Sequence, residues 1–189
     1  RCSRDWSSDV CSSDLIKQVV EELRQELPRL KTFATLSPIP GFQNWLQSVL
    51  SDLGSLPEAV PWLHAAQQVD RPDWHRNKAL AARIEPHMQS LCAYYLLHAK
   101  SALQPLDPVA RFHLGNGARL ARLNWLADLS RQGMKQSAGM MVNYEYRLDE
   151  VERNHELFAN ENRVVSSGRL ETLSRECVLH PRRTRNREK

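Results

Sequence analysis

The sequence predicts one α+β (α/β-like) domain in which many helices pack on a small mixed sheet. Two segments, 31–37 and 140–146, are rich in β-formers, and in the second one the side chains alternate with a period of two, as in a half-buried strand. The segments between them carry apolar residues three and four positions apart, which indicates amphipathic helices. Because few strands lie among many helices and no internal repeat is present, helices packed on one small sheet are expected.

The first element expected is a helix over residues 16–27. Its apolar residues share one face while charged residues occupy the other, and Pro28 ends it because proline lacks a backbone donor. The strand at 31–37 follows. Pro38 disfavours helical geometry at the residue before it, so Ser37 is expected in extended backbone at the exit of this strand.

Three further helical regions are expected before the middle of the chain. An apolar stripe over 42–53 predicts a helix that Gly54 ends, and three prolines divide 56–73 into short helical pieces. A longer helix is expected from about Pro86 onward. Its inward face carries Met88, Leu91, Cys92 and Tyr95.

The second half begins with a helix-start signal at Asp107-Pro108, an N-cap type of residue followed by proline. Two glycines in segment 111–118 let the backbone approach a neighbour closely. Leucines at helical spacing then predict a helix over 118–128, before the strand at 140–146. These leucines are Leu120, Leu123 and Leu126.

The two ends of the chain are expected to differ from the domain of residues 16–165. The run from Asp5 to Leu15 resembles a translated DNA-sequencing adapter, so we interpret residues 1–15 as a non-native leader without ordered structure. Residues 166–189 contain a cluster of arginines without apolar periodicity. We expect them to form a poorly ordered basic tail.

Composition narrows the class of protein. A hydrophobic share of 41% with 25% charged residues is ordinary for a soluble globular protein, and no apolar run approaches the roughly 20 residues of a membrane span. No membrane partner is therefore expected. The net charge of +4 is concentrated in the tail, where it can contact phosphates, but a solvated terminus is the simpler interpretation. Nucleic acid is not expected as a partner.

The metal-binding residue types show no metal-site spacing. The four cysteines lie too far apart for a CxxC-type site, and the seven histidines form no HxH or HxxxH pair. No metal is therefore expected. Cys92 lies on a helical apolar stripe and is interpreted as a small buried hydrophobic residue.

Four blocks of sequence carry a resemblance to a known family. They are TLSPIPGF at 35–42, DPVARFHLGNGA at 107–118, LNWLAD at 123–128 and AGMMVNYEY at 138–146. In this order and at these separations, they resemble the catalytic domain of the malonyl-CoA decarboxylase family. The likeness runs from about residue 16 to about residue 158.

This resemblance implies a partial GNAT-type (acetyltransferase-like) fold and the conversion of malonyl-CoA into acetyl-CoA and carbon dioxide. It also implies a reaction without a metal or organic cofactor. The family's catalytic serine falls on Ser37 and its histidine on His113. A tyrosine that lines the same pocket falls on Tyr146, and Asn116 is a candidate for holding the loop or the substrate.

These residue types suit the chemistry. Loss of carbon dioxide from a malonyl thioester leaves an enolate, and one preorganised donor to its oxygen contributes about 3–4 kcal/mol. The hypothesis is that His113 polarises the thioester or donates the proton, while Ser37 orients the carboxylate or relays that proton. Tyr146 then shapes the pocket. Without the resemblance, these residues read as a turn serine, a half-buried histidine and a core aromatic.

Other functions stay open. One is a CoA-dependent acyltransferase on the same fold, which a product assay separates because it needs an acceptor. Another is an inactive truncated fragment, because the family's glycine-rich phosphate-binding segment is replaced here by the leader at 1–15. The sequence also leaves a homo-oligomer open. A cytoplasmic location is expected because the last three residues are not a peroxisomal Ser-Lys-Leu.

Overall fold

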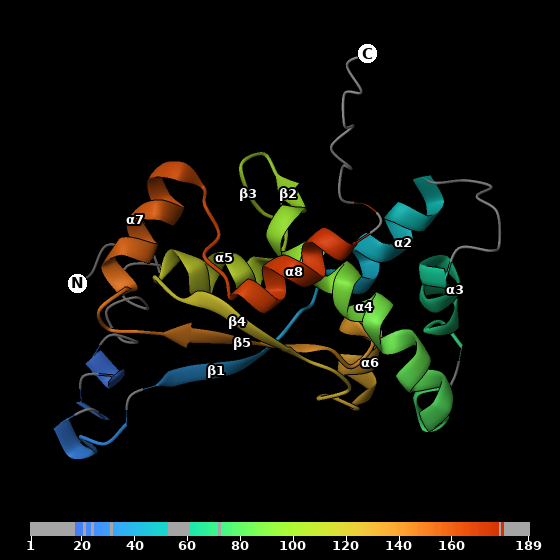
Figure 1. Cartoon of the computed structure of the whole chain (residues 1–189), viewed down its shortest axis with the longest axis horizontal. Coiled ribbons are helices and arrows are strands. Elements are labelled where there is room, and N and C mark those ends of the chain that lie inside the picture. Colours follow the sequence, from blue (N-terminus) through green and yellow to red (C-terminus); the bar gives the residue numbers. More distant parts are fainter. Residues whose placement is uncertain are drawn as a thin grey trace, which may run out of the picture.

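The computed structural model describes residues 18–20, 22–23, 25–30, 32–52, 61–71, 73–177 and 179. Residues 18–20, 22, 23, 25 and 26 are helical, and the remaining elements carry the labels of Figure 1. These are β1 (Phe33–Pro38), α2 (Phe42–Asp52), α3 (Pro61–Gln68), η1 (Trp74–Arg76), α4 (Lys78–His98), β2 (Lys100–Ser101), β3 (Gln104–Pro105), α5 (Pro108–Gly115), β4 (Arg119–Asn124), α6 (Arg131–Ser137), β5 (Met141–Tyr146), α7 (Val151–Glu161) and α8 (Gly168–Glu176). The α+β class predicted from the sequence is confirmed.

The central sheet has three strands in the order β1-β5-β4, with α7 near one end of the strands and α6 near the other (Figure 1). Both strand pairs are antiparallel, and the described part of the chain adds one isolated parallel bridge, Leu120–Ser166. Ser37 is paired with Val142, so both side chains lie on one face of the sheet. The next pair on that face is Thr35–Tyr144.

The two strands expected from alternation are confirmed, each within two residues of its expected bounds. In β5 the side chains of Val142, Tyr144 and Tyr146 are buried on the face that carries Ser37. On the opposite face of β1, Leu36 is 54% exposed. One face is therefore packed and the other is more open, which is the arrangement that produces a period of two.

The helix predicted over 118–128 is wrong, because this segment contains strand β4. A bulge lies between Leu120 and Arg122, and it adds one residue to β4 opposite β5. The extra residue returns Leu123 to the buried face that Leu120 already occupies. Two buried leucines three positions apart, the spacing used to predict a helix, are here a consequence of the bulge.

The start predicted for the long helix, near Pro86, is also wrong. Helix α4 begins at Lys78, where the side chain of Asn77 accepts a hydrogen bond from the Leu80 N–H and caps the first turn. Pro86 lies inside the helix on its exposed side. Because Pro86 has no backbone N–H, the carbonyl of Ala82 loses its helical hydrogen-bond partner. Ala82 is exposed, so water can hydrate this carbonyl.

The tail predicted from residue 166 onward is wrong over its first part, because residues 168–176 form α8. Ser167 caps this helix and Leu170 is buried. The Ser90 hydroxyl of α4 donates to the Leu173 carbonyl at 2.9 Å. This helix is short and mostly polar, and its stability comes from packing its apolar face against α4, so little in the sequence alone indicated it. Residues 180–189, like the leader at 1–15, lie outside the described residues.

The helices bring a continuous apolar core against the packed face of the sheet. Helix α4 provides eight of its buried residues, and Cys92 is fully buried there as a free thiol, as expected. The capped helix start at Asp107-Pro108 is confirmed as the beginning of α5. None of the described helices is long and apolar enough to span a membrane.

Candidate active site

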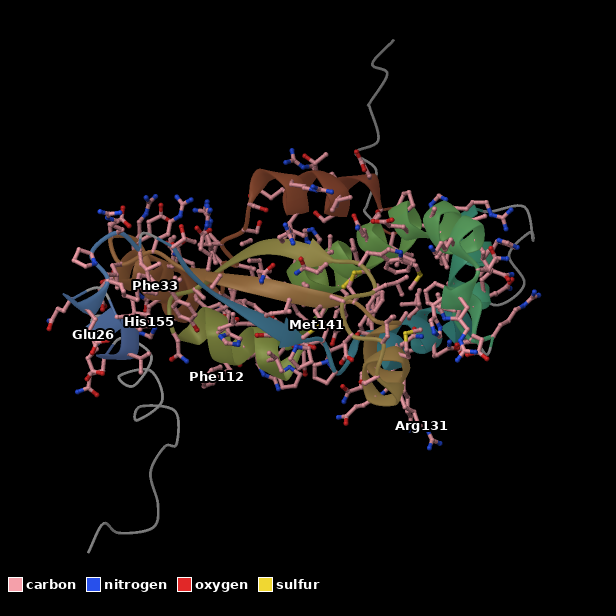
Figure 2. All side chains as sticks on the ribbon, turned by 90° about the horizontal axis from the view of Figure 1, so that it is seen from below. Glu26, Phe33, Phe112, Arg131, Met141 and His155 are labelled. Carbon is pink, nitrogen blue, oxygen red and sulfur yellow. The ribbon has the colours of Figure 1, made fainter. Side chains whose placement is uncertain are left out.

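Three different elements bring the residues expected at the site together. Ser37 lies near the end of β1 in extended backbone, as Pro38 requires, and Tyr146 is the last residue of β5. His113 lies on α5 with its imidazole turned to the sheet. Its neighbour Phe112 is 40% exposed and projects on the side of α5 away from the strands (Figure 2).

A continuous chain of hydrogen bonds links these side chains. The Ser37 hydroxyl oxygen lies 3.1 Å from Nε2 of His113, and Nδ1 of His113 lies 2.7 Å from the Tyr146 hydroxyl oxygen. On the other side, the hydroxyl oxygen of Thr35 lies 2.9 Å from that of Ser37. Ser37, His113 and Tyr146 are each at most 8% exposed, so water competes little for these bonds.

Burial keeps the histidine uncharged. Removal from water lowers the pKa of His113 to about 4, because the protein interior disfavours the imidazolium. The imidazole also stacks on the ring of Tyr144, with centroids 4.3 Å apart and planes inclined by 20°. A neutral, clamped imidazole has one N–H donor and one acceptor nitrogen, and it cannot supply a full positive charge near neutral pH.

The two hydroxyls that contact His113 are compatible with either neutral tautomer. Burial raises the pKa of Tyr146, so its hydroxyl stays protonated and is both a donor and an acceptor. In one tautomer Tyr146 donates to Nδ1, and the ring proton on Nε2 points to the oxygen of Ser37. In the other tautomer Nδ1 donates to Tyr146, and Nε2 accepts from the hydroxyl of Ser37. The distances fit both.

Asn116 does not join this chain of hydrogen bonds in the described structure. It is the C-cap of α5, and its backbone N–H donates to the carbonyls of Phe112 and His113. The residue is buried, and it holds the end of the helix that carries His113. Its role toward a substrate stays a prediction.

Sequence reasoning missed two residues of the site, Thr35 and Tyr144. Thr35 lies two positions before Ser37 on a strand, and Tyr144 lies two positions before Tyr146. Residues two apart on a strand share a face, so the period of two was the available signal. Among the described residues, no group of three His, Cys, Asp or Glu side chains is placed to hold a metal ion.

The buried, uncharged His113 is expected to make folding stability depend on pH. Between pH 6.5 and 4 the unfolded chain binds a proton at this residue that the folded chain does not, so stability falls as the pH is lowered. The free energy of unfolding should fall by about 2 kcal/mol from pH 7 to pH 5 through His113 alone. Urea unfolding at several pH values measures this. The free energy of unfolding should depend more steeply on pH for the native chain than for His113→Gln, and equal slopes contradict the prediction.

Comparison with known proteins places this geometry in a family. The family model for the malonyl-CoA decarboxylase C-terminal domain matches residues 10–187. Curated relatives named mitochondrial malonyl-CoA decarboxylase, from Rattus norvegicus and Anser anser anser, are 36% and 34% identical over 84% and 81% of this chain. The chain covers 36% and 34% of their respective lengths.

Solved structures agree with these matches. The crystal structure of malonyl-CoA decarboxylase from Rhodopseudomonas palustris has a TM-score of 0.79 and 46% identity, covering 84% of this chain and 37% of that one. The structure from Agrobacterium vitis has a TM-score of 0.78 and 44% identity, covering 86% of this chain and 40% of that one. The chain therefore belongs to the malonyl-CoA decarboxylase C-terminal domain family.

Proposed function

We propose that this domain decarboxylates malonyl-CoA to acetyl-CoA and carbon dioxide, a carboxy-lyase reaction of fatty acid metabolism. The observation that carries the proposal is the buried chain in which an uncharged His113 stands between the hydroxyls of Ser37 and Tyr146. Family membership supports it, and so do relatives that are named malonyl-CoA decarboxylase.

We assign the tautomer in which Tyr146 donates to Nδ1 and the ring proton of His113 is on Nε2, and the chemistry follows from this assignment. The bond between the α-carbon and the carboxylate breaks, carbon dioxide leaves, and the electron pair forms an enolate on the thioester. The Ser37 hydroxyl then protonates the α-carbon, while the Nε2–H of His113 stabilises the serine oxygen. One proton from water restores Ser37 in each turnover. The thioester carbonyl is itself the electron sink, so we propose that no metal or organic cofactor takes part.

The proposed tautomer argues against a serine nucleophile, which a covalent acyl-transfer route requires. Such a route needs an unprotonated Nε2 to take the proton of Ser37. In the proposed tautomer the Tyr146 hydroxyl donates to Nδ1, and the imidazole proton is on Nε2. A hydroxyl held by an N–H donor is a proton donor and an oxyanion stabiliser, which is what an enolate requires.

The test is release of acetyl-CoA and carbon dioxide from malonyl-CoA without any acyl acceptor. It should be run with this chain and with the domain in a protein of the length of its relatives. Thioesters separated by chromatography and carbon dioxide trapped from labelled malonyl-CoA should appear in equal amounts. A folded protein that consumes malonyl-CoA only when an amine or hydroxyl acceptor is added would favour the acyltransferase instead.

Thr35→Val is expected to lower kcat by about 3–10-fold. Valine keeps the shape of threonine and removes one hydrogen bond to Ser37, and such a bond contributes about 0.5–1.5 kcal/mol. Initial rates at saturating malonyl-CoA measure the effect. Thr172→Val is the matched control, because the one described hydrogen bond of the exposed Thr172 hydroxyl goes to the Gly168 carbonyl within α8. Equal rates in both variants contradict a role for Thr35.

Location and assembly are separate proposals. We propose a cytoplasmic enzyme. Cell fractionation tests this, and recovery in an organelle contradicts it. A homo-oligomer is proposed as well, and light scattering at several concentrations tests it.

A further inference from the structure

The buried carboxylate of Asp107 contacts both the helix that carries His113 and the turn that follows Ser37. Asp107 is 1% exposed and is the N-cap of α5, the helix that carries His113. Its Oδ1 accepts a hydrogen bond of 2.9 Å from the N–H of Ala110. Its Oδ2 lies 3.4 Å from the hydroxyl oxygen of Tyr95, on α4, and 3.5 Å from the backbone nitrogen of Gly41.

Gly41 belongs to the turn that follows Ser37, and this turn rests directly on the pair formed by Tyr95 and Asp107. A Cβ atom at position 41 would lie 2.3 Å from the Tyr95 hydroxyl oxygen and 3.8 Å from Oδ2 of Asp107. No side chain fits into that distance. The serine turn therefore takes its position from contact of the backbone with these two side chains.

Oδ1 and Oδ2 of Asp107 thus hold different segments. Oδ1 holds the start of the helix six residues before His113, and Oδ2 faces the turn four residues after Ser37. The Ser37–His113 hydrogen bond joins residues 76 positions apart, so its length depends on how these two segments are placed. Tyr144, which stacks on His113, is close enough to Asp107 for that carboxylate to contribute, after burial, to its raised pKa.

We propose that Asp107 is a positioning residue of this site, which fixes the serine turn against the histidine helix through its second carboxylate oxygen. The choice of aspartate supports this. Burial raises the pKa of Asp107, so the carboxylate is costly to bury, and asparagine caps a helix about equally well. A cap alone therefore does not require a carboxylate. The contacts with Gly41 and Tyr95 do require a carboxylate, because its second oxygen accepts there, where an amide would present a donor.

Asp107→Asn separates the two roles at nearly constant volume. The amide oxygen keeps the cap to Ala110, while the amide nitrogen meets the N–H of Gly41 as donor against donor. We expect kcat for malonyl-CoA to fall at least tenfold with KM changed less than threefold. Tyr95→Phe, which removes one donor to Oδ2, should lower kcat about threefold. Ser130→Ala is the control, because Ser130 caps α6, which carries no site residue.

A second readout does not depend on the reaction. Nitrogen chemical shifts of the His113 ring, measured by NMR in the full chain, report which nitrogen carries the proton. Asp107→Asn should shift the Nε2 resonance, because the hydrogen bond between Nε2 and Ser37 is altered, whereas Ser130→Ala should leave both ring nitrogens unchanged. The kinetic arm rests on the proposed decarboxylation, and this arm still tests Asp107 if malonyl-CoA is not the substrate.

Two outcomes overturn the proposal. One is an Asp107→Asn variant with unchanged His113 shifts, whether or not kcat is altered. The other is a Ser130→Ala variant with the same loss of kcat, because lost stability alone then explains the effect. A shift change confined to the Asp107 and Tyr95 variants supports it.

Discussion

Replacing His113 with alanine is expected to lower kcat for malonyl-CoA decarboxylation by about 10³-fold, which is about 4 kcal/mol. In the proposed tautomer the imidazole donates its N–H to the hydroxyl of Ser37, and it connects Ser37 to Tyr146. Its removal leaves both hydroxyls without that partner in a buried site. One preorganised donor contributes about 3–4 kcal/mol in comparable sites, which sets the magnitude. Rates of acetyl-CoA release at saturating substrate measure it.

Two further variants show whether the loss comes from the donor. His113→Gln can place an amide N–H near the position of Nε2, so it should recover part of the activity, about tenfold over alanine. His64→Ala removes a histidine on α3 that bonds only to Gln68 in the described structure, and it should keep full activity. A His113→Ala enzyme with more than a tenth of native kcat contradicts the assignment.

Sequence reasoning succeeded where one physical cause dominated the pattern. One face of β5 is packed, with Val142, Tyr144 and Tyr146 buried, and the other face is more open apart from Glu145. This difference produces the alternation from which the strand was predicted. Pro38 determines the backbone of Ser37 locally, so its extended conformation was also predictable. In both cases the determining interactions lie within a few residues of each other.

The failures have the opposite cause. The bulge in β4 and the proline within α4 depend on neighbours that are remote in the sequence. Leu120 and Leu123 carry a helical spacing only because the bulge returns Leu123 to the inner face. Pro86 is tolerated because it lies on the exposed side of a helix whose other face is buried. Tertiary packing overrides the local preference at both places.

The resemblance named candidate site residues, and their role in catalysis stays a prediction. Ser37, His113 and Tyr146 came from resemblance, while the distances between them came only from the structure. The pKa of about 4 for His113 has no counterpart in the sequence, because desolvation arises only from packing. The GNAT-type fold implied by the resemblance stays a prediction.

Ser37→Ala is expected to lower kcat by about 10²-fold with a smaller change in KM. The variant removes the hydroxyl that contacts Nε2 of His113 and that is proposed to protonate the α-carbon. A water molecule replaces it in part, so the loss is smaller than for His113. Single-turnover rates of acetyl-CoA formation measure the chemical step. Ser51→Ala is the control, because among the described contacts the exposed Ser51 hydroxyl bonds only to the Gln47 carbonyl one turn earlier in α2.

The same variant distinguishes a proton donor from a nucleophile. A nucleophilic Ser37 would accumulate a malonyl or acetyl ester, visible as an added mass on the native protein after acid quench. The Nε2–H tautomer of His113 opposes that route, so no adduct is expected and solvent deuterium should appear in the methyl group of acetyl-CoA. An adduct on the native protein that is absent from Ser37→Ala would reverse the direction of proton transfer inferred for the whole chain of hydrogen bonds. A rate for Ser37→Ala within threefold of the native enzyme would remove Ser37 from the mechanism.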